Sequence, residues 1–269
     1  MEYIIEVKNL VKEFKGFRAV DDISFYVKRG EVFGFLGPNG AGKSTTIKML
    51  CTLLRPTSGS GRVAEHDIVE DPALVREHIG LVAEKIILYD RLTALENLMF
   101  FGSLYHLPKK EIADRAKKWL QTLEMGKWQD KPVGTFSTGM KQRVNIARAL
   151  LTQPEVMFLD EPTLGLDPQT SRSIRDFIKD LHAHGVTVIL TTHIMPEADE
   201  LADTIAIIDH GKIIALNTPQ NLKLSIQKEN ATLEDVFLQL TGRDMREETH
   251  NNVPSARGGH MFGGRSRIR

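Results

Sequence analysis

Short apolar runs alternate with amphipathic stretches along the chain, and their order predicts an α/β fold. Near the start, runs of β-forming residues cover Tyr3–Val7 and Ala19–Val27, with turns between the runs. Val32–Leu36 is apolar throughout, which is typical of a strand that is buried on both faces of a sheet. A glycine-rich turn comes next, and Thr45–Leu54 then predicts a helix that an Arg-Pro pair ends.

The middle of the chain changes to a helical periodicity, from about Asp71 to Met125. Apolar residues of this stretch fall into two sets, each of which would share one helix face. The sets are Leu92, Leu95, Leu98 and Met99, and then Ile112, Ala116, Trp119 and Leu123. We therefore predict a helical insert or subdomain in this part of the chain.

Strands and helices alternate again after Pro132. The predicted elements are a helix, a strand, a helix, a strand and, after a short helix, a last strand: Thr138–Leu151, Val156–Leu159, Pro168–His184, Val186–Thr191 and Thr204–Ile208. This alternation implies a mostly parallel sheet with crossover connections. We expect one ordered domain over residues 1–240, with the helical subdomain at about 85–150. Residues 241–269 are polar and then rich in Gly, Arg, Ser and Asn, so we expect a flexible C-terminal tail.

Composition narrows the class of protein. The chain has 269 residues, enough for a large core, and its 35 basic and 35 acidic residues balance. Zero net charge gives no general attraction to nucleic acid, so no nucleic-acid partner is expected. Cys51 is the single cysteine, which points to a reducing cytosol. No apolar stretch approaches the roughly 20 residues that span a bilayer, and no signal peptide is visible, so we expect a cytoplasmic protein.

The glycine-rich turn carries the strongest chemical signal. It fits the phosphate-loop pattern of a glycine, four free positions and Gly-Lys-Ser, between a predicted strand and a predicted helix. Its residues are Gly37, Pro38, Asn39, Gly40, Ala41, Gly42, Lys43 and Ser44, followed by Thr45. Backbone N–H groups and the helix N-terminus would hold phosphates here. Lys43 would reach the β- and γ-phosphates, and the Ser44 hydroxyl would bind Mg²⁺.

A pair of carboxylates ends the strand Val156–Leu159. Asp160 at the carboxyl end of this strand can hold Mg²⁺ through its water shell, and Glu161 can orient and deprotonate an attacking water. Alone, such a pair is more often a surface cap of the next helix, but beside a phosphate loop it indicates hydrolysis. The sequence has no Asn-Lys-x-Asp motif for reading guanine, so these residues favour an ATPase over a GTPase.

A third motif identifies a family. The stretch Phe136–Arg143 precedes a helix that contains Ala147–Leu150, and it resembles the signature motif of ATP-binding-cassette (ABC) transporter ATPases. Other parts of the family pattern occur in order, namely Leu166-Asp167 and Thr191-Thr192-His193. The resemblance covers about residues 1–240. It implies a P-loop NTPase cassette with a mostly parallel core sheet, an N-terminal antiparallel β subdomain and a helical subdomain.

The resemblance also implies roles for single residues. Phe14 would stack on adenine, and the less favoured alternative is that it serves the core. His193, at a strand end, would bond the γ-phosphate as part of the catalytic set with Glu161 and Lys43. Asp167 would contribute to the ATP site, and the signature residues Ser137, Thr138, Gly139 and Met140 would contact ATP held by a second copy of the cassette.

Three positions depart from the commonest family pattern. Thr138 stands where glycine is usual, and Met140 stands where glutamine is usual. Glu84 ends the stretch Ile79–Glu84, at a position where the family commonly has glutamine. An ionised glutamate accepts hydrogen bonds but donates none, so Glu84 is expected to help hold Mg²⁺ or water.

The resemblance implies an ATP-binding and ATP-hydrolysing subunit that energises a membrane transporter through ATP-driven dimerisation of two cassettes. Its partners would be a separately encoded permease and a second copy, and it would lie on the cytoplasmic face of the cell membrane. The stretch Ala231–Phe237 is similar to cassettes of drug-, polysaccharide- and sodium-exporting systems, which favours an exporter. The alternative is a soluble ABC ATPase of translation or DNA maintenance. DNA-maintenance members carry long coiled coils before the signature and translation members usually carry two cassettes, and this sequence shows neither.

Overall fold

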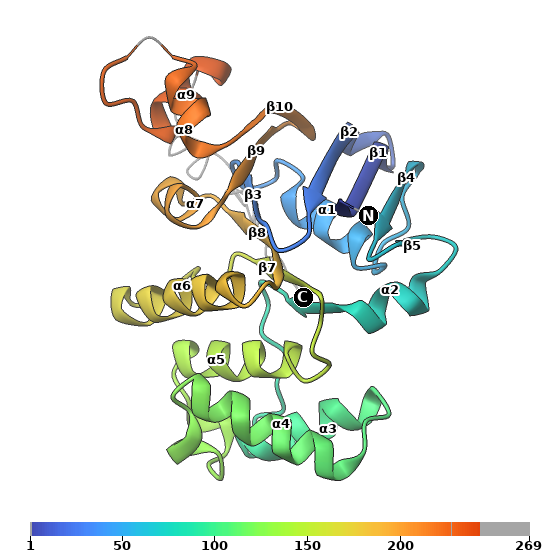
Figure 1. Cartoon of the computed structure of the whole chain (residues 1–269), viewed down its shortest axis with the longest axis vertical. Helices are drawn as coiled ribbons and strands as arrows, with labels where there is room; N and C mark the ends of the chain where they lie inside the picture. Colours follow the sequence, from blue (N-terminus) through green and yellow to red (C-terminus); the bar gives the residue numbers. More distant parts are fainter. Residues whose placement is uncertain (1, 227, 243–269) are drawn as a thin grey trace, which may run out of the picture.

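The structure is a computed structural model, and it describes residues 2–226 and 228–242. Figure 1 shows its arrangement. The strands are β1 (Tyr3–Phe14), β2 (Phe17–Lys28), β3 (Val32–Leu36), β4 (Ser58–Val63), β5 (His66–Asp67), β6 (Ile79–Val82), β7 (Val156–Asp160), β8 (Thr187–Thr192), β9 (Thr204–Asp209) and β10 (Lys212–Asn217). The α-helices are α1 (Lys43–Leu50), α2 (Pro72–His78), α3 (Ala94–Leu104), α4 (Lys109–Thr122), α5 (Thr138–Ala149), α6 (Pro168–Ala183), α7 (Met195–Leu201), α8 (Pro219–Leu224) and α9 (Leu233–Thr241). Two 3₁₀ turns, η1 (Gly126–Trp128) and η2 (Val133–Thr135), lie between α4 and α5.

The core is a six-stranded sheet in the order β10-β9-β3-β8-β7-β6. Every pairing in it is parallel except that of β9 with β10, as the alternation of strands and helices predicted. The strand predictions for this region agree with β3, β7, β8 and β9 to within one residue at each end. The three central strands β3, β8 and β7 are buried along their whole length, which explains their continuous apolar runs.

A second, antiparallel sheet has the order β2-β1-β4-β5. Its first two strands form a hairpin in which Phe14 pairs with Phe17 across a two-residue turn. Lys15 and Gly16 both have positive φ, 45° and 85°, as the tight I′ turn of a twisted hairpin requires. β1 extends seven residues beyond the range expected for it, and β2 two residues earlier and one later, because the turn at residues 15–16 continues the pairing of the two strands.

An aromatic cluster joins the two sheets. Phe25 of the antiparallel sheet lies 5.2 Å, centroid to centroid, from both Phe33 and Phe35 of β3. Buried residues of α1, including Ile47 and Met49, belong to the same core, so this helix packs between the sheets (Figure 1). The start of α1 is thereby fixed relative to the end of β3, where the phosphate loop lies.

The prediction of a helical region is confirmed for its main part and is wrong for one segment. Helices α3, α4 and α5 pack together at one end of the molecule (Figure 1), and Leu98, Ile112 and Ala116 are buried there as the periodicity predicted. Ile79–Val82, however, lies within the stretch expected to be helical and forms the edge strand β6. Pairing with β7 buries this short apolar run, and four residues are too few for a helical period to be distinguished from a strand.

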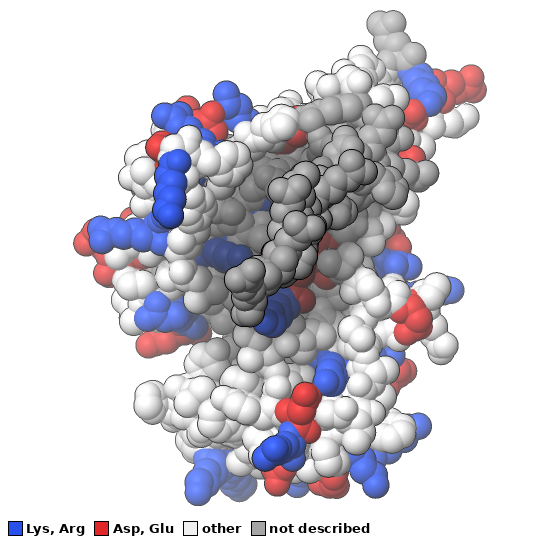
Figure 2. All heavy atoms as spheres, turned by 180° about the vertical axis from the view of Figure 1, so that it is seen from behind, with Lys and Arg blue, Asp and Glu red and all other residues white. Residues whose placement is uncertain are grey.

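The C-terminal part of the cassette adds α8 and α9, which pack with α7 around Leu36 and β9. Helix α9 continues to Thr241, one residue into the stretch expected to be a tail, and the rest of that prediction, from residue 243, lies outside the described residues. Within residues 2–226 and 228–242, no helix is both long and apolar enough to cross a bilayer. Figure 2 shows acidic and basic side chains interspersed over the described surface of one face, in keeping with the balanced net charge.

We predict that Gly80→Ala destabilises the protein by about 1–3 kcal/mol, as overpacking of a core does. A Cβ at Gly80 would lie 2.6 Å from the backbone oxygen of Ala149, at the end of α5, and 2.5 Å from the sulfur of Met157. The backbone of Ala149 cannot move aside without shifting α5, the signature helix, which begins in the signature motif. Chemical denaturation of the variant and the wild type measures the difference.

Gly102→Ala is the matched comparison. A Cβ there would meet only side-chain atoms of Ile112, at 2.5 Å and beyond, and a side chain can change its rotamer. Alanine also has the better helix propensity within α3, by roughly 1 kcal/mol. We expect Gly102→Ala to be much less destabilising, and an equal loss in the two variants would contradict the packing argument.

Candidate ATP site

The phosphate loop leaves the carboxyl end of β3 and becomes the first turn of α1. Gly42, directly before the helix, has φ +110°, and a Cβ there would lie 2.5 Å from the backbone oxygen of Ala19. Only glycine satisfies both conditions. The loop is also tied to the turn between β9 and β10, because the N–H of Gly211 donates to the backbone oxygen of Ala41 at 2.9 Å. The loop is therefore held in shape from two sides.

The Lys43 side chain is buried and folds back over the loop. Its Nζ donates to the backbone oxygens of Gly37 at 2.7 Å and Pro38 at 3.1 Å. Nζ also lies 3.2 Å from Glu161 Oε1, an ion pair whose alignment does not make a hydrogen bond. Both side chains of this pair are about 95% buried. The lysine charge thus lies between the loop and the strand β7.

A hydrogen bond joins Ser44 of the phosphate loop to Asp160 of the carboxylate pair. Ser44 Oγ donates to Asp160 Oδ1 at 2.8 Å, and Thr191 Oγ1 donates to the same carboxylate oxygen at 2.6 Å. Thr191 pairs with Asp160 in the sheet, so adjacent strands present these groups side by side. A hydroxyl and a carboxylate are hard oxygen ligands of the kind that Mg²⁺ takes, and the two are close enough to share one ion's coordination shell.

The Glu161 carboxylate makes a hydrogen bond with His193, which directly follows strand β8. His193 Nδ1 lies 2.9 Å from Glu161 Oε2, so one carboxylate meets the lysine and the histidine together. Burial alone raises the pKa of Glu161, but the His193 hydrogen bond and the Lys43 charge outweigh it, and the pKa lies below its ordinary value. The hydrogen bond to Glu161 raises the pKa of His193. Glu161 is therefore ionised at neutral pH.

A cavity of about 440 Å³ opens above the loop. Phe14 lies on its wall with its side chain half exposed, which suits an aromatic group that stacks on a ligand rather than one that serves the core. Glu84 also reaches this wall. The other lining residues are Phe17, Ala19, Pro38, Asn39, Gly40, Gly42, Lys43, Ser44, Thr45, Glu161 and Leu164. Gly37, Ala41 and Asp160 are buried and do not line the cavity.

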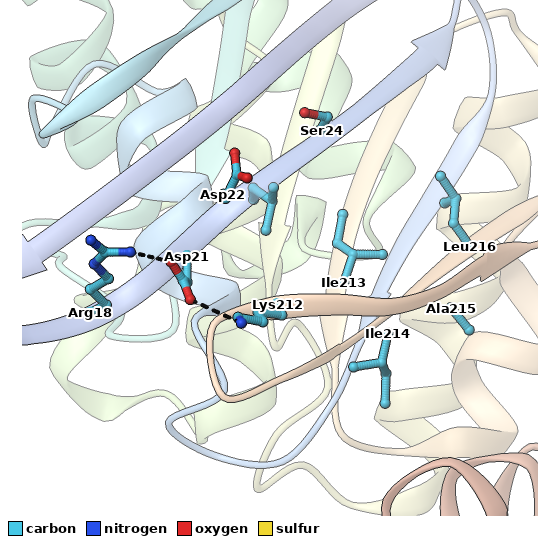
Figure 3. A pocket seen from close by; sticks show the side chains of 10 residues that line it. Arg18, Asp21, Asp22, Ser24, Lys212, Ile213, Ile214, Ala215 and Leu216 are labelled. Atoms are coloured by element: carbon cyan, nitrogen blue, oxygen red, sulfur yellow. Dashed lines mark hydrogen bonds and ion pairs between the residues drawn. The ribbon is translucent and has the colours of Figure 1, made fainter.

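A larger hollow of about 700 Å³ lies between the edges of the two sheets, at β2 and β10 (Figure 3). Arg18 and Lys212 both pair with Asp21 there, and Asp22 adds a second carboxylate, so the lining carries no net positive charge. The rest of the lining that β10 provides is mainly aliphatic. The smaller cavity over the phosphate loop is the one whose chemistry fits a triphosphate.

The signature residues lie apart from that cavity. Ser137 caps α5 by accepting a hydrogen bond from the N–H of Met140, and both line a separate hollow with Arg143. Thr138 is exposed beside them. Gly139 is buried, and a Cβ there would lie 2.7 Å from Thr170 Cγ2. Glycine at this position therefore allows α5 to approach the start of α6.

Asp167 does not line the phosphate-loop cavity of its own chain. It caps α6, where its carboxylate accepts hydrogen bonds from the N–H and the hydroxyl of Thr170. These bonds lower the pKa of Asp167. Within one chain Asp167 is a helix cap.

Sequence reasoning missed several residues of the site. Phe17 lies on the cavity wall with Phe14, and the hairpin signal Lys15-Gly16 could have placed it there. Leu164 lies in the turn that follows the carboxylate pair, and no sequence pattern marks it as a site residue. The sequence indicates Thr191 only as part of the Thr-Thr-His motif, although its hydroxyl donates to Asp160. Such a bond depends on strand register, which the sequence does not state.

Comparison with known proteins agrees with this geometry. The profile of the ABC transporter family matches residues 20–164. The daunorubicin/doxorubicin resistance ATP-binding protein DrrA of Streptomyces peucetius is 44% identical over 222 residues, which cover 82% of this chain and 67% of that protein. The chain spans 42% of the length of two other relatives, the probable multidrug ABC transporter ATP-binding protein YbhF of Escherichia coli and of Shigella flexneri, to which it is 42% identical over 242 residues, or 89% of this chain.

Two solved structures share the fold. An ATP-binding subunit of an ABC transporter has a TM-score of 0.80 and 31% identity, over 88% of this chain and 99% of that one. The ATP-binding cassette MJ0796, solved as a dimer in a post-hydrolysis state bound to ADP and Pi, has a TM-score of 0.73 and 28% identity, over 80% of this chain and 98% of that one. The expected P-loop cassette fold is confirmed, and the relatives favour transport over the soluble alternative. The chain therefore belongs to the ABC transporter family, as an ATP-binding and ATP-hydrolysing cassette that energises a membrane transporter.

Proposed function

We propose that this chain powers an exporter by closing, with a second copy, around two molecules of ATP. The observation that carries this proposal is the buried meeting of Lys43, Glu161 and His193 beneath the phosphate-loop cavity. A lysine and a histidine held against one carboxylate, next to a glycine-rich loop at a helix N-terminus, form a site for a polyanion and an activated water. The 440 Å³ cavity would hold part of a nucleotide, and the open side of the cavity would face the second copy.

Lys43 would exchange its present partners for the β- and γ-phosphates. The loop residues Gly37–Thr45 would hold the phosphates by backbone N–H groups and the start of α1. Phe14 would stack on adenine, since its half-exposed ring borders the cavity. Ser44 and Asp160, with Glu84 at the wall, would hold Mg²⁺, which supplies charge neutralisation between the phosphates.

Glu161 would act as the general base. Its lowered pKa keeps it ionised, so it can accept a proton from a water placed between the carboxylate and the γ-phosphate. When Lys43 moves to the phosphates, the carboxylate loses one partner and keeps His193. His193 then orients Glu161 and can bond the γ-phosphate with its other ring nitrogen. Its raised pKa favours the cationic form beside the phosphate.

A second copy would complete each site. Ser137, Thr138, Gly139 and Met140 lie at the start of a twelve-residue helix on a different part of the surface from the cavity. In a two-fold dimer this helix N-terminus would face ATP on the partner, with Asp167 beside it. The dimeric state of the similar cassette MJ0796 supports this arrangement.

Residues 1–240 would form the cassette, with the helical subdomain at about 85–150 receiving a separately encoded permease. The protein would lie at the cytoplasmic face of the membrane. The relative DrrA is named for resistance to daunorubicin and doxorubicin, which supports export as the direction of transport. Cargo would be chosen by the permease, because the cassette does not need to touch it.

Glu161→Gln is expected to keep ATP binding and to reduce hydrolysis by about a hundredfold or more, because an amide keeps the shape but is not a base. ATP should then trap a stable dimer. Phosphate release measures turnover, and a calorimetric titration measures binding. Turnover at the wild-type rate would show that Glu161 is not the base.

Lys43→Ala should weaken ATP binding at least about tenfold, because a buried charge-assisted contact is lost. Lys48→Ala is the matched control, since Lys48 lies on the same helix but is exposed. Calorimetric titration with ATP measures all three proteins. Equal affinity of Lys43→Ala and Lys48→Ala would contradict the assignment of the phosphate loop.

Ser137→Arg is expected to block ATP-driven dimerisation and hydrolysis while ATP binding by the monomer persists, because the bulky side chain would fill the closed interface. Sedimentation with saturating ATP, in the Glu161→Gln background and with the permease present, tests this. Ser58→Arg, on exposed β4, should dimerise normally. If Ser137→Arg dimerises as well as Ser58→Arg, the head-to-tail arrangement is wrong.

A further inference from the structure

A second buried carboxylate, Glu197, lies behind the candidate site, and the reaction outlined above does not use it. It belongs to α7, four residues after His193, and only 3% of it is exposed. Its Oε1 accepts a hydrogen bond of 2.7 Å from the hydroxyl of Thr163, which is itself buried. Its Oε2 is buried without a hydrogen-bond partner among the described residues. Burial raises the pKa of Glu197 above its ordinary value, although the hydroxyls of Thr192 and Thr163 act to lower it.

Thr163 lies in the turn that follows the catalytic carboxylate. Glu161 itself has φ +51°, in the left-handed region that a non-glycine residue adopts only when its surroundings enforce it. The turn closes when the N–H of Leu164 donates to the backbone oxygen of Glu161 at 3.2 Å. The direction of the Glu161 side chain therefore depends on what holds residues 161–164 in place.

Three elements hold this turn. From β8, Thr191 accepts the N–H of Glu161 through its backbone oxygen and its hydroxyl, both at 3.1 Å. From the signature helix α5, Gln142 donates to the backbone oxygen of Pro162 at 2.8 Å, a buried bond. From α7, Glu197 binds the Thr163 hydroxyl. Glu197 is thus the contact between the helix that follows His193 and the turn that follows Glu161.

We propose that Glu197 is a positioning residue that holds Glu161 in its left-handed, reactive orientation through the hydroxyl of Thr163. This inference rests on the proposed role of Glu161 as the base. Because Glu197 and His193 belong to one short segment, the bond fixes the distance between the base and the histidine that orients it. The phosphate loop takes no part in this contact, so loss of the bond should affect the chemical step and leave ATP binding intact.

The test uses paired substitutions at both ends of the bond in the full chain. Glu197→Ala and Thr163→Val each remove it, and each should lower kcat for ATP about tenfold or more with little change in KM, since small displacements of a catalytic group slow the reaction strongly. Glu197→Gln keeps a side-chain oxygen that accepts the bond, and Thr163→Ser keeps the donor. Both conservative variants should restore kcat toward the wild-type value.

The double variant Thr163→Val/Glu197→Ala should be no slower than the slower single variant, because both changes break one bond. Asp199→Ala is the matched control, since it removes only a surface ion pair of the same helix, with Lys223. Thr163→Val keeps the side-chain shape, so it tests the bond even if Glu197→Ala does not fold.

The proposal is overturned if Thr163→Val keeps the wild-type kcat, if Glu197→Gln is as slow as Glu197→Ala, or if the losses in the double variant multiply. Glu161→Gln separates this result from the proposed function. A slow Glu161→Gln together with a fast Thr163→Val refutes only the positioning role. A fast Glu161→Gln refutes the base assignment itself.

Discussion

Parallel pairing of β3, β8 and β7 is the constraint on which the site depends. Their register places Leu36 opposite Thr192 and Thr191 opposite Asp160, so the three strands end at one level. Loops that leave parallel strands at their carboxyl ends meet at one edge of the sheet. The phosphate loop, the carboxylate pair and the histidine are far apart in sequence, and this register alone brings them within hydrogen-bond distance.

Burial at that edge then forces the charges to pair. Lys43 and Glu161 are almost fully buried, and His193 closes the group on its exposed side. Charges in such surroundings are tolerated only with partners, so without nucleotide the cation and the base neutralise each other. In the proposed reaction a triphosphate would take Lys43 as its partner, and Glu161 would remain paired with His193.

Several neighbouring elements together hold the backbone at Glu161 in its strained conformation. Its left-handed conformation is enforced by bonds from β8, α5 and α7, and two of these elements carry other motifs of the family. The signature helix α5 therefore contacts the turn that follows Glu161 in its own chain, through the bond of Gln142 to Pro162. Motion of the helical subdomain can thus influence the position of Glu161 within the same molecule.

The sequence by itself determined the α/β class, the phosphate loop, the carboxylate pair and the family, because these are local patterns whose residue types and spacing are set by chemistry. It wrongly extended the helical region over Ile79–Val82, since four apolar residues become a strand only through pairing with β7. Only the tertiary structure decided that Phe17 and Leu164 line the cavity, that Thr191 binds Asp160 and that Glu197 reaches Thr163. These contacts depend on register and packing between distant segments, and no single stretch of sequence contains that information.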